Sequence, residues 1–325
     1  MKKYINLLLF LPLFTLQAQE WQLKNTNLYI ENDADVRTDE AYSHGAKLSF
    51  LFFRDDLKES PLHIPFTNYK SSDNYISFAY TQQLFTPNDI EATELVIDDR
   101  PYVGYMSVQS GLHQSLNNTL KSLIIQLGIV GPSAKMEDVQ EFVHGLIGSP
   151  MPQGWDNQIG DEMIFQINYG EKKYYDLKKI FSLDTVVIPE YGFELGNAST
   201  KLYGGLLYRF GWGIPKDYGS FSIDNHSYSK IPLTAKKIVE KKGWKFCFNL
   251  GLKANAIAQN IFLDGNSNKE SHSVEKNNFT LEGTYGFSLV YNQMSLDYTR
   301  TQSTKEFKNQ KNYLGYGSLL FSYSY

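Results

Sequence analysis

The chain has 325 residues, and 31 Lys and Arg oppose 35 Asp and Glu, for a formal net charge of −4 at pH 7. This balance does not favour nucleic-acid binding, which uses a basic surface. The 23 Tyr and 21 Phe suit strands, and the 24 Gly suit turns, so the composition indicates an all-β protein. The single cysteine, Cys247, excludes an internal disulfide and cannot make a zinc site alone. We expect it to be a small strand residue rather than a nucleophile.

The N-terminus predicts an export signal. Lys2 and Lys3 form a short positive region, an almost uninterrupted apolar run covers 5–16, and Gln17-Ala18-Gln19 follows. This order is typical of a secretory signal peptide, and the run is shorter than a membrane-spanning helix. We therefore predict that residues 1–18 are a signal peptide; a retained membrane anchor is the alternative.

Alternation of apolar and polar residues recurs along the rest of the chain and predicts strands. It is clearest in 279–291, where one face is apolar and the other carries Thr280, Glu282 and Thr284. The predicted strands lie near 21–31, 44–54, 74–85, 101–114, 119–130, 162–175, 183–196, 200–213, 243–258, 278–291, 293–302 and 313–325.

These strands favour a membrane barrel. After the signal, no stretch is apolar for long enough to be a spanning helix, and only helices or closed barrels satisfy every backbone group in lipid. The last strand alternates and ends on Tyr325, as bacterial outer-membrane barrels commonly do. We predict one domain over 19–325, a closed antiparallel transmembrane β-barrel of about 12 strands. A soluble all-β sandwich or barrel is the alternative, but it does not account for the aromatic C-terminus.

Twelve strands with both termini in the periplasm also predict sidedness. Segments 32–43, 86–100 and 131–161 then lie together on the outer side, facing the exterior. The connection 214–242 falls on the periplasmic side, where turns are normally short. Either the strand count is off or this connection is an ordered insertion.

Segment 131–161 contains the one convincing helix beyond the signal. Ser133 can cap its start and Gly148 fits its end. Gln140 and His144 are four residues apart, and therefore share a face. The same face carries Met136, Val143 and Ile147. His144 is either a hydrogen-bonded histidine in a packed cap or a general base beside an acyl-chain groove, held by Gln140.

Asn32-Asp33 ends the first predicted strand. A carboxylate among amide and backbone oxygens suits a hard cation such as Ca²⁺, and an Asn amide can donate to a developing oxyanion. An Asn-Asp pair at this position is also a common turn, which is the alternative interpretation.

Gly154-Trp155-Asp156-Asn157-Gln158 follows the helix, and Glu162 comes shortly after. Trp155 can lie at the membrane interface, with its ring in lipid and its N–H in water. Asp156 and Glu162 can orient a histidine or hold the loop. The alternative is a loop fixed by its own amide bonds.

These motifs occur together in one order. They are Asn32-Asp33, Thr38-Asp39, Tyr42-Ser43-His44-Gly45, Phe85-Thr86-Pro87, Asp99-Arg100-Pro101-Tyr102-Val103-Gly104, and Gly131-Pro132-Ser133 with Gln140, His144 and Gly148, then 154–158. Weaker matches continue through 211–215, 306–307 and 316–318. In combination they resemble the outer-membrane lipid A 3′-O-deacylase family over essentially the whole mature chain.

The resemblance implies an enzyme that removes the 3′-acyloxyacyl chain from lipid A, with a mechanism like that of secreted phospholipase A2. His144 then resembles the base that activates water, and Gln140 the residue that shapes the site beside it. Asp33 matches the carboxylate of the family's Ca²⁺ site, Asn32 the amide that supports the oxyanion, and Ser43 the site hydroxyl. We also expect Arg100 and Trp155 to contact the substrate. No Gly-x-Ser-x-Gly motif is present, so a serine nucleophile is not proposed.

The sequence departs from the family pattern in two places. His44 stands where the family usually has Asn. The loop 88–94 is acidic, whereas a well-studied branch of the family has basic residues suited to a lipid A phosphate. Arg100 could substitute for them, Ca²⁺ could bridge, or the substrate could carry fewer phosphates.

Two other functions remain open at this stage. An outer-membrane phospholipase shares the same chemistry with a different head group. A porin, adhesin or receptor barrel is non-enzymatic, and its lumen would be expected to conduct. For the leading interpretation we expect lipid A or lipopolysaccharide as the substrate, the outer membrane as the location, a monomer, and no nucleic-acid partner.

Overall fold

The computed structural model describes residues 21–33, 41–54, 72–219, 223, 230–235 and 243–325. The predicted signal peptide over 1–18 and the Thr38-Asp39 motif lie outside these residues. None of the helices in the described ranges has the length and hydrophobicity to cross a membrane.

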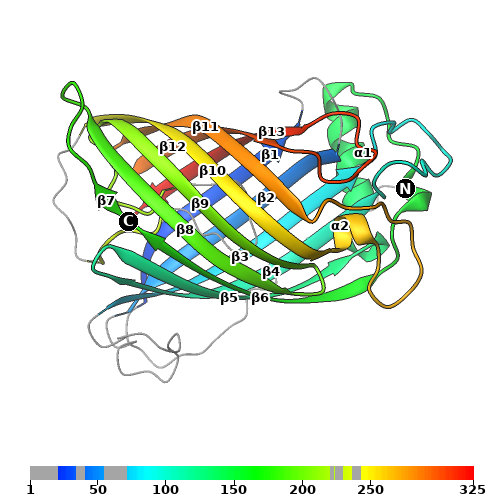
Figure 1. Cartoon of the computed structure of the whole chain (residues 1–325), viewed down its shortest axis with the longest axis horizontal. Coiled ribbons are helices and arrows are strands. Elements are labelled where there is room, and N and C mark those ends of the chain that lie inside the picture. The colour runs from blue at the N-terminus through cyan, green and yellow to red at the C-terminus, as the bar shows by residue number, and fades with distance from the viewer. Residues whose placement is uncertain (1–20, 34–40, 55–71, 220–222, 224–229, 236–242) are drawn as a thin grey trace, which may run out of the picture.

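The described residues form twelve long antiparallel strands that close into one barrel (Figure 1). Neighbours in sequence pair with one another, and the barrel closes where β1 pairs with β13. The strands are β1 (Gln22–Asn32), β2 (Ala41–Phe53), β3 (Asp73–Thr86), β4 (Val103–Leu116), β5 (Thr119–Val130), β6 (Glu162–Lys173), β8 (Asp184–Gly196), β9 (Ser199–Trp212), β10 (Trp244–Asn260), β11 (Phe279–Tyr291), β12 (Met294–Ser303) and β13 (Leu314–Ser324). The two-residue β7 (Tyr175–Asp176) continues the line of β6 along β8.

The twelve predicted strands are all confirmed, with ends that differ by a few residues. For example, β4 begins at Val103 rather than at 101, because Pro101 has no backbone N–H to donate to the ladder. The helices α1 (Met136–Ile147) and α2 (Ile261–Asp264) lie at one end of the barrel, which we call the helical end (Figure 1). The opposite end, where β1 begins and β13 ends, is the plug end.

Polar side chains fill the barrel and apolar side chains cover it. Charged inward residues pair across strands, as Lys201 does with Glu194 at 3.3 Å and Lys172 with Glu190 at 3.6 Å. Large apolar residues are exposed on the outer face: Leu28, Ile30, Phe78, Val108, Ile125, Leu127, Phe165, Leu206, Phe248, Leu250 and Phe321. This pattern is that of a barrel surrounded by lipid, and it is the reverse of a soluble barrel.

The connection after β9 is an ordered insertion in its described parts, so the predicted strand count holds. Tyr218 and Ile231 are fully buried among the inward side chains of the strands. The Tyr218 hydroxyl lies 2.8 Å from Ser115 Oγ, and the backbone N–H of Ala235 donates to Asp73. We call the described residues of this insertion, 214–219, 223 and 230–235, the lumen plug.

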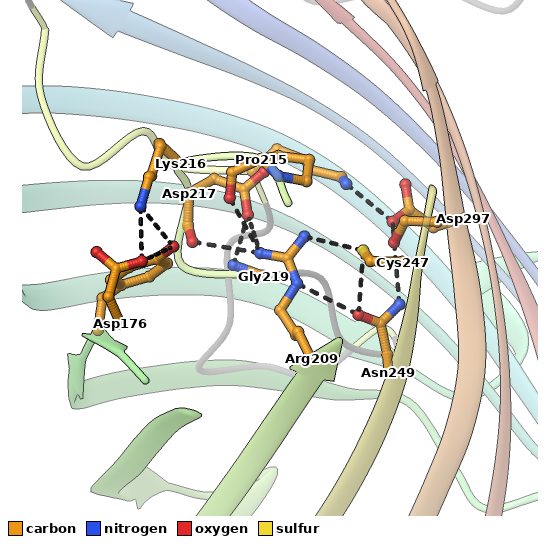
Figure 2. Close-up of polar contacts among 12 residues, drawn as sticks. Asp176, Arg209, Pro215, Lys216, Asp217, Gly219, Cys247, Asn249 and Asp297 are labelled. Atoms are coloured by element: carbon orange, nitrogen blue, oxygen red, sulfur yellow. Dashed lines mark hydrogen bonds and ion pairs between the residues drawn. The ribbon is translucent and has the colours of Figure 1, made fainter. Parts of the chain in front are cut away.

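Buried ion pairs hold the lumen plug to the barrel wall (Figure 2). Arg209 of β9 contacts Asp217 at 2.8 Å, and Lys230 contacts Asp297 of β12 at 2.8 Å. Burial raises the pKa of the Asp217 carboxyl, but Arg209 and Lys230 beside it more than offset this, so the pKa lies below its ordinary value. A third pair, Lys216 with Asp176, is solvent-exposed.

The plug offers a matched comparison of a buried and an exposed ion pair. Arg209→Met would leave the Asp217 carboxylate buried without its partner, and we expect a loss of about 3–5 kcal/mol in unfolding free energy. Lys216→Met breaks the exposed pair and should cost about 0–1 kcal/mol. Urea unfolding of the two variants in lipid vesicles measures both values. Equal losses would contradict the assignment of Asp217 as a buried anchor.

Candidate active site

Helix α1 packs on the outer wall of the barrel, over β3 and β4. Leu84 and Met106 belong to these strands and contact Met136, at the start of α1. Their strand neighbours Phe85 and Tyr105 point the other way, into a cluster with Phe262 of α2. Since successive strand side chains alternate between faces, the α1 cluster lies outside the barrel.

A glycine permits this close approach. A Cβ at Gly104 of β4 would lie only 2.9 Å from the Met136 Cβ. Any larger residue at 104 would therefore push the helix away from the wall. The position of α1, and of every side chain on its inner face, depends on this contact.

The ends of α1 differ in part from those predicted. Gly148 ends the helix with φ 73°, as expected, and its N–H donates to the His144 carbonyl. Ser133 is not the cap, because Pro132–Ala134 forms a separate 3₁₀ turn and Lys135 precedes the helix. Instead, the N–H and hydroxyl of Ser133 both donate to Asp161 at 2.7 Å. These two hydrogen bonds hold the pKa of Asp161 below its ordinary value.

The inner face of α1 carries Met136, Gln140 and His144, all buried, which confirms the predicted shared face. Ile147 was expected on the same face but is 63% exposed, because the helix ends there. Phe142 and Leu146, four residues apart, form an exposed apolar flank. Glu137 and Glu141 form an acidic flank on the other side, since each residue turns the helix by about 100°.

The tautomer of His144 follows from its partner. Its Nδ1 lies 2.6 Å from the Pro150 carbonyl oxygen. A carbonyl only accepts, so Nδ1 carries a proton, and in the neutral form of the ring the lone pair is on Nε2. The imidazole is therefore oriented as a base at Nε2.

Gln140 is oriented by Trp155. The indole Nε1–H donates to Gln140 Oε1 at 2.8 Å. Trp155 is 2% exposed and packs against Tyr102, with ring centroids 5.0 Å apart. Trp155 was expected at the membrane interface, but the structure places it beneath α1, where it holds Gln140.

The end of β1 lies at the same end of the barrel as α1. Asn32 pairs with His44, His44 with Leu84, and Leu84 with Gly104, so one row of partners runs from Asn32 to the foot of the helix. Asn32 Nδ2 donates to the Ser43 carbonyl at 2.7 Å. The Ser43 hydroxyl lies 2.6 Å from that of Thr86. These bonds tie three strand ends together, and Asp33 beside them is fully buried.

Thr86 is a site residue to which sequence reasoning assigned no role. It is fully buried and shares its hydroxyl contact with Ser43. The sequence signal for Thr86 was the Phe85-Thr86-Pro87 motif. Pro87 follows the strand, and so places Thr86 at the strand's end. Only the pairing of β2 with β3 shows which partner Thr86 has.

Three predicted residues have other partners in the structure. Arg100 is buried, pairs with Glu306 and lies over the Phe85 ring, so its charge is used on the lumen side rather than at α1. Asp156 is exposed, and Pro150 rather than Asp156 binds His144 Nδ1. Glu162 accepts from Asn197, Asn266 and Ser267, and therefore holds the loop after α2 rather than the histidine.

Comparison with known proteins identifies the family. The model of the family described as "Outer membrane protein LpxR" matches residues 5–325. The chain belongs to the LpxR family of outer-membrane proteins.

A solved structure of the family agrees with the barrel fold. LpxR from Salmonella typhimurium matches this LpxR-family chain with a TM-score of 0.72 at 16% identity, covering 93% of this chain and 100% of that one. The beta domain of the Bordetella autotransporter BrkA has a TM-score of 0.45 at 10% identity, covering 93% and 98%. The likeness to the Salmonella protein, at this identity, is one of fold. No curated protein sequence matches the chain.

The side-chain oxygen atoms at the end of β1 are of the type that binds a hard cation. The Asp33 carboxylate and the Asn32 amide oxygen are the ligand types that Ca²⁺ prefers. In the described part of this LpxR-family chain, no three His, Cys, Asp or Glu side chains are grouped to hold a metal ion. A Ca²⁺ ion here would therefore need further oxygens from the backbone, water or substrate.

Proposed function

We propose that this LpxR-family protein is an outer-membrane ester hydrolase that removes the 3′-linked acyloxyacyl chain from lipid A. The observation that carries the proposal is the orientation of His144, whose Nδ1 is bound by the Pro150 carbonyl so that Nε2 is a base. The position of α1 on the outer side of the barrel wall supports a lipid substrate. Family membership and the order of the motifs support lipid A as the substrate.

The surroundings of α1 favour a lipid substrate. Phe142 and Leu146 form an exposed apolar flank, and the outer faces of β4 and β5 also expose apolar residues such as Val108 and Leu127. The helix then lies at the edge of the lipid with its acidic flank toward water, as interfacial amphipathic helices do. At that depth an acyl ester of a membrane lipid, rather than a soluble ester, is within reach of His144.

The connections support an orientation with the helical end outward. At the plug end, 117–118 and 292–293 are two-residue turns, whereas the connections 54–72 and 213–243 are long. At the helical end, 87–102, 131–161, 261–278 and 304–313 are long, and 197–198 is a two-residue turn. Beyond the plug connection and 54–72, the longer connections therefore gather at the helical end. Outer-membrane barrels have short periplasmic turns and longer extracellular loops, so this orientation brings His144 to the outer leaflet, where lipid A resides.

The reaction follows from one base and one water molecule. His144 Nε2 takes a proton from water as the water oxygen attacks the ester carbonyl carbon. The bond from that carbon to the sugar oxygen then breaks, and the imidazolium returns the proton to the leaving oxygen. The products are a free fatty acid and a sugar hydroxyl, and no covalent enzyme intermediate is needed.

We further propose that Ca²⁺ binds at Asp33 and Asn32. When bound, the ion supplies positive charge that stabilises the negative charge developing on the ester oxygen. Ser43 and Thr86 contribute by tying the strand ends that hold these two residues in place.

A phospholipase is the second candidate, and the acidic flank of α1 favours it. Burial raises the pKa of Glu137, and the neighbouring carboxylates Glu141, Asp138 and Asp156 raise it further, which reflects a negative local field. Such a field opposes a substrate with several phosphates unless cations bridge. Parallel assays of the purified protein on phosphatidylethanolamine and lipid A separate the two candidates.

The first prediction concerns the base. His144→Ala should lower acyl release by about 10²–10⁴-fold, because water then has no positioned base. Mass spectrometry of lipid A from cells that express each variant measures the loss of the acyl chain. His272→Gln is the control, since His272 only binds the Asp99 carbonyl at the same end of the barrel, and should remain active. Intact lipid A in cells with the wild-type protein would contradict the proposed function.

The second prediction concerns the cation. A Ca²⁺ chelator should stop acyl release, and added Ca²⁺ should restore it. Asp33→Asn removes the charged ligand and should raise the Ca²⁺ concentration for half-maximal activity by about tenfold or more. Asp98→Asn, in the exposed loop 88–98, is the matched control and should behave as wild type. Full activity of the wild type in the presence of the chelator would contradict a role for Ca²⁺ in the reaction.

A further inference from the structure

Two side chains on the inner face of α1, His144 and Gln140, are each oriented by a partner that can take only one role in a hydrogen bond. The Pro150 carbonyl only accepts, and so leaves His144 Nε2 as a base. The Trp155 indole only donates, so the Gln140 atom it contacts must be oxygen. The amide nitrogen of Gln140 is therefore directed away from Trp155.

That amide nitrogen is a buried donor without an acceptor. Gln140 is 2% exposed, and its Nε2 makes no hydrogen bond in the part of the chain that the structure describes. Buried side-chain donors almost always have a partner in folded proteins, and a catalytic role is one of the explanations for an exception. His144 lies one helical turn further along the same face, so the two buried side chains are neighbours on the helix.

We propose that Gln140 donates a hydrogen bond from Nε2 to the ester carbonyl oxygen, and that Trp155 is the positioning residue that fixes this donor. The inference rests on the proposed function and extends it. As water adds to the carbonyl carbon, the oxygen gains negative charge, and a donor already in place stabilises it without reorganisation. Gln140 is a neutral donor. Its hydrogen bond would stabilise the oxyanion in addition to the positive charge of the proposed cation.

The chemistry of Trp155 supports positioning over simple packing. A phenylalanine would keep a ring contact with Tyr102, whose centroid lies 5.0 Å from that of Trp155. Only the indole N–H reaches Gln140. Without it the amide could rotate and present its oxygen, which would repel the developing oxyanion.

The test replaces the donor and keeps the shape. Gln140→Glu is isosteric and still accepts from Trp155, but its carboxylate has no N–H. We expect kcat for acyl release to fall by about 10²–10³-fold with little change in KM. Trp155→Phe should lower kcat by about ten- to a hundredfold. The double variant should be no slower than Gln140→Glu alone, because Trp155 acts only through Gln140.

Matched controls separate these effects from general damage. Glu141→Gln makes the reverse exchange at the next, exposed position and should keep wild-type kcat. Trp212→Phe changes an exposed tryptophan on the barrel's outer face and should do the same. The indole N–H resonance of Trp155 reports the hydrogen bond without any assay: it should shift in Gln140→Leu and stay in place in Glu141→Gln.

The outcomes distinguish this inference from the proposed function. A wild type that releases no acyl chain overturns the proposed function, and the donor role with it. An active wild type, an inactive His144→Ala and a Gln140→Glu variant with kcat within twofold of wild type would overturn the donor role alone. Additive losses in the double variant, or an unmoved indole resonance in Gln140→Leu, would overturn the positioning role of Trp155.

Discussion

The contact between helix α1 and the outer wall of the barrel is the constraint on which the rest of this structure depends. Gly104 lets Met136 approach the wall, and Leu84, Tyr102 and Trp155 complete the apolar cluster around it. The packing fixes the rotation of the helix about its own axis. That rotation decides which side chains face the wall, which face lipid and which face water. The packing thereby holds His144, the proposed base, on the inner face of the helix, outside the lumen.

The lumen behind this wall is lined with paired polar side chains. Inward polar side chains pair across the strands, and the lumen plug adds buried ion pairs at the far end from α1. Because inward side chains and the lumen plug occupy the interior, the proposed reaction would use the outer surface of the barrel. A porin makes the opposite use of the same architecture, with loops that leave the interior open. The charge of Arg100 is likewise used on the lumen side, where it pairs with Glu306.

The sequence predicted much of the fold and part of the site. All twelve strands were predicted because each alternates, and alternation is a local property of the chain. Gln140 and His144 were placed on one face by their spacing alone. The partners of these residues were not predictable: Pro150 and Trp155 reach them through a loop whose path depends on packing. Arg100 was expected to contact the substrate in place of the basic residues that loop 88–94 lacks; its partner in the structure, Glu306, is 206 residues away and could not be foreseen. Only the length of the connection 214–242 suggested an ordered insertion. Its ion pairs could not be predicted, because they join segments that are distant in sequence.

The depth of α1 in the membrane decides whether His144 can meet a lipid substrate. Cys247 is fully buried, so a cysteine introduced at the surface can be labelled selectively with a fluorophore. The label would be placed at Leu146 on the apolar flank, or at Glu141 on the acidic flank, in vesicles that contain lipids with quenchers at known depths. We expect quenchers in the upper acyl region to quench the label at 146 strongly and the label at 141 weakly. Equal, weak quenching at both positions would place the helix in water and contradict a lipid substrate for His144.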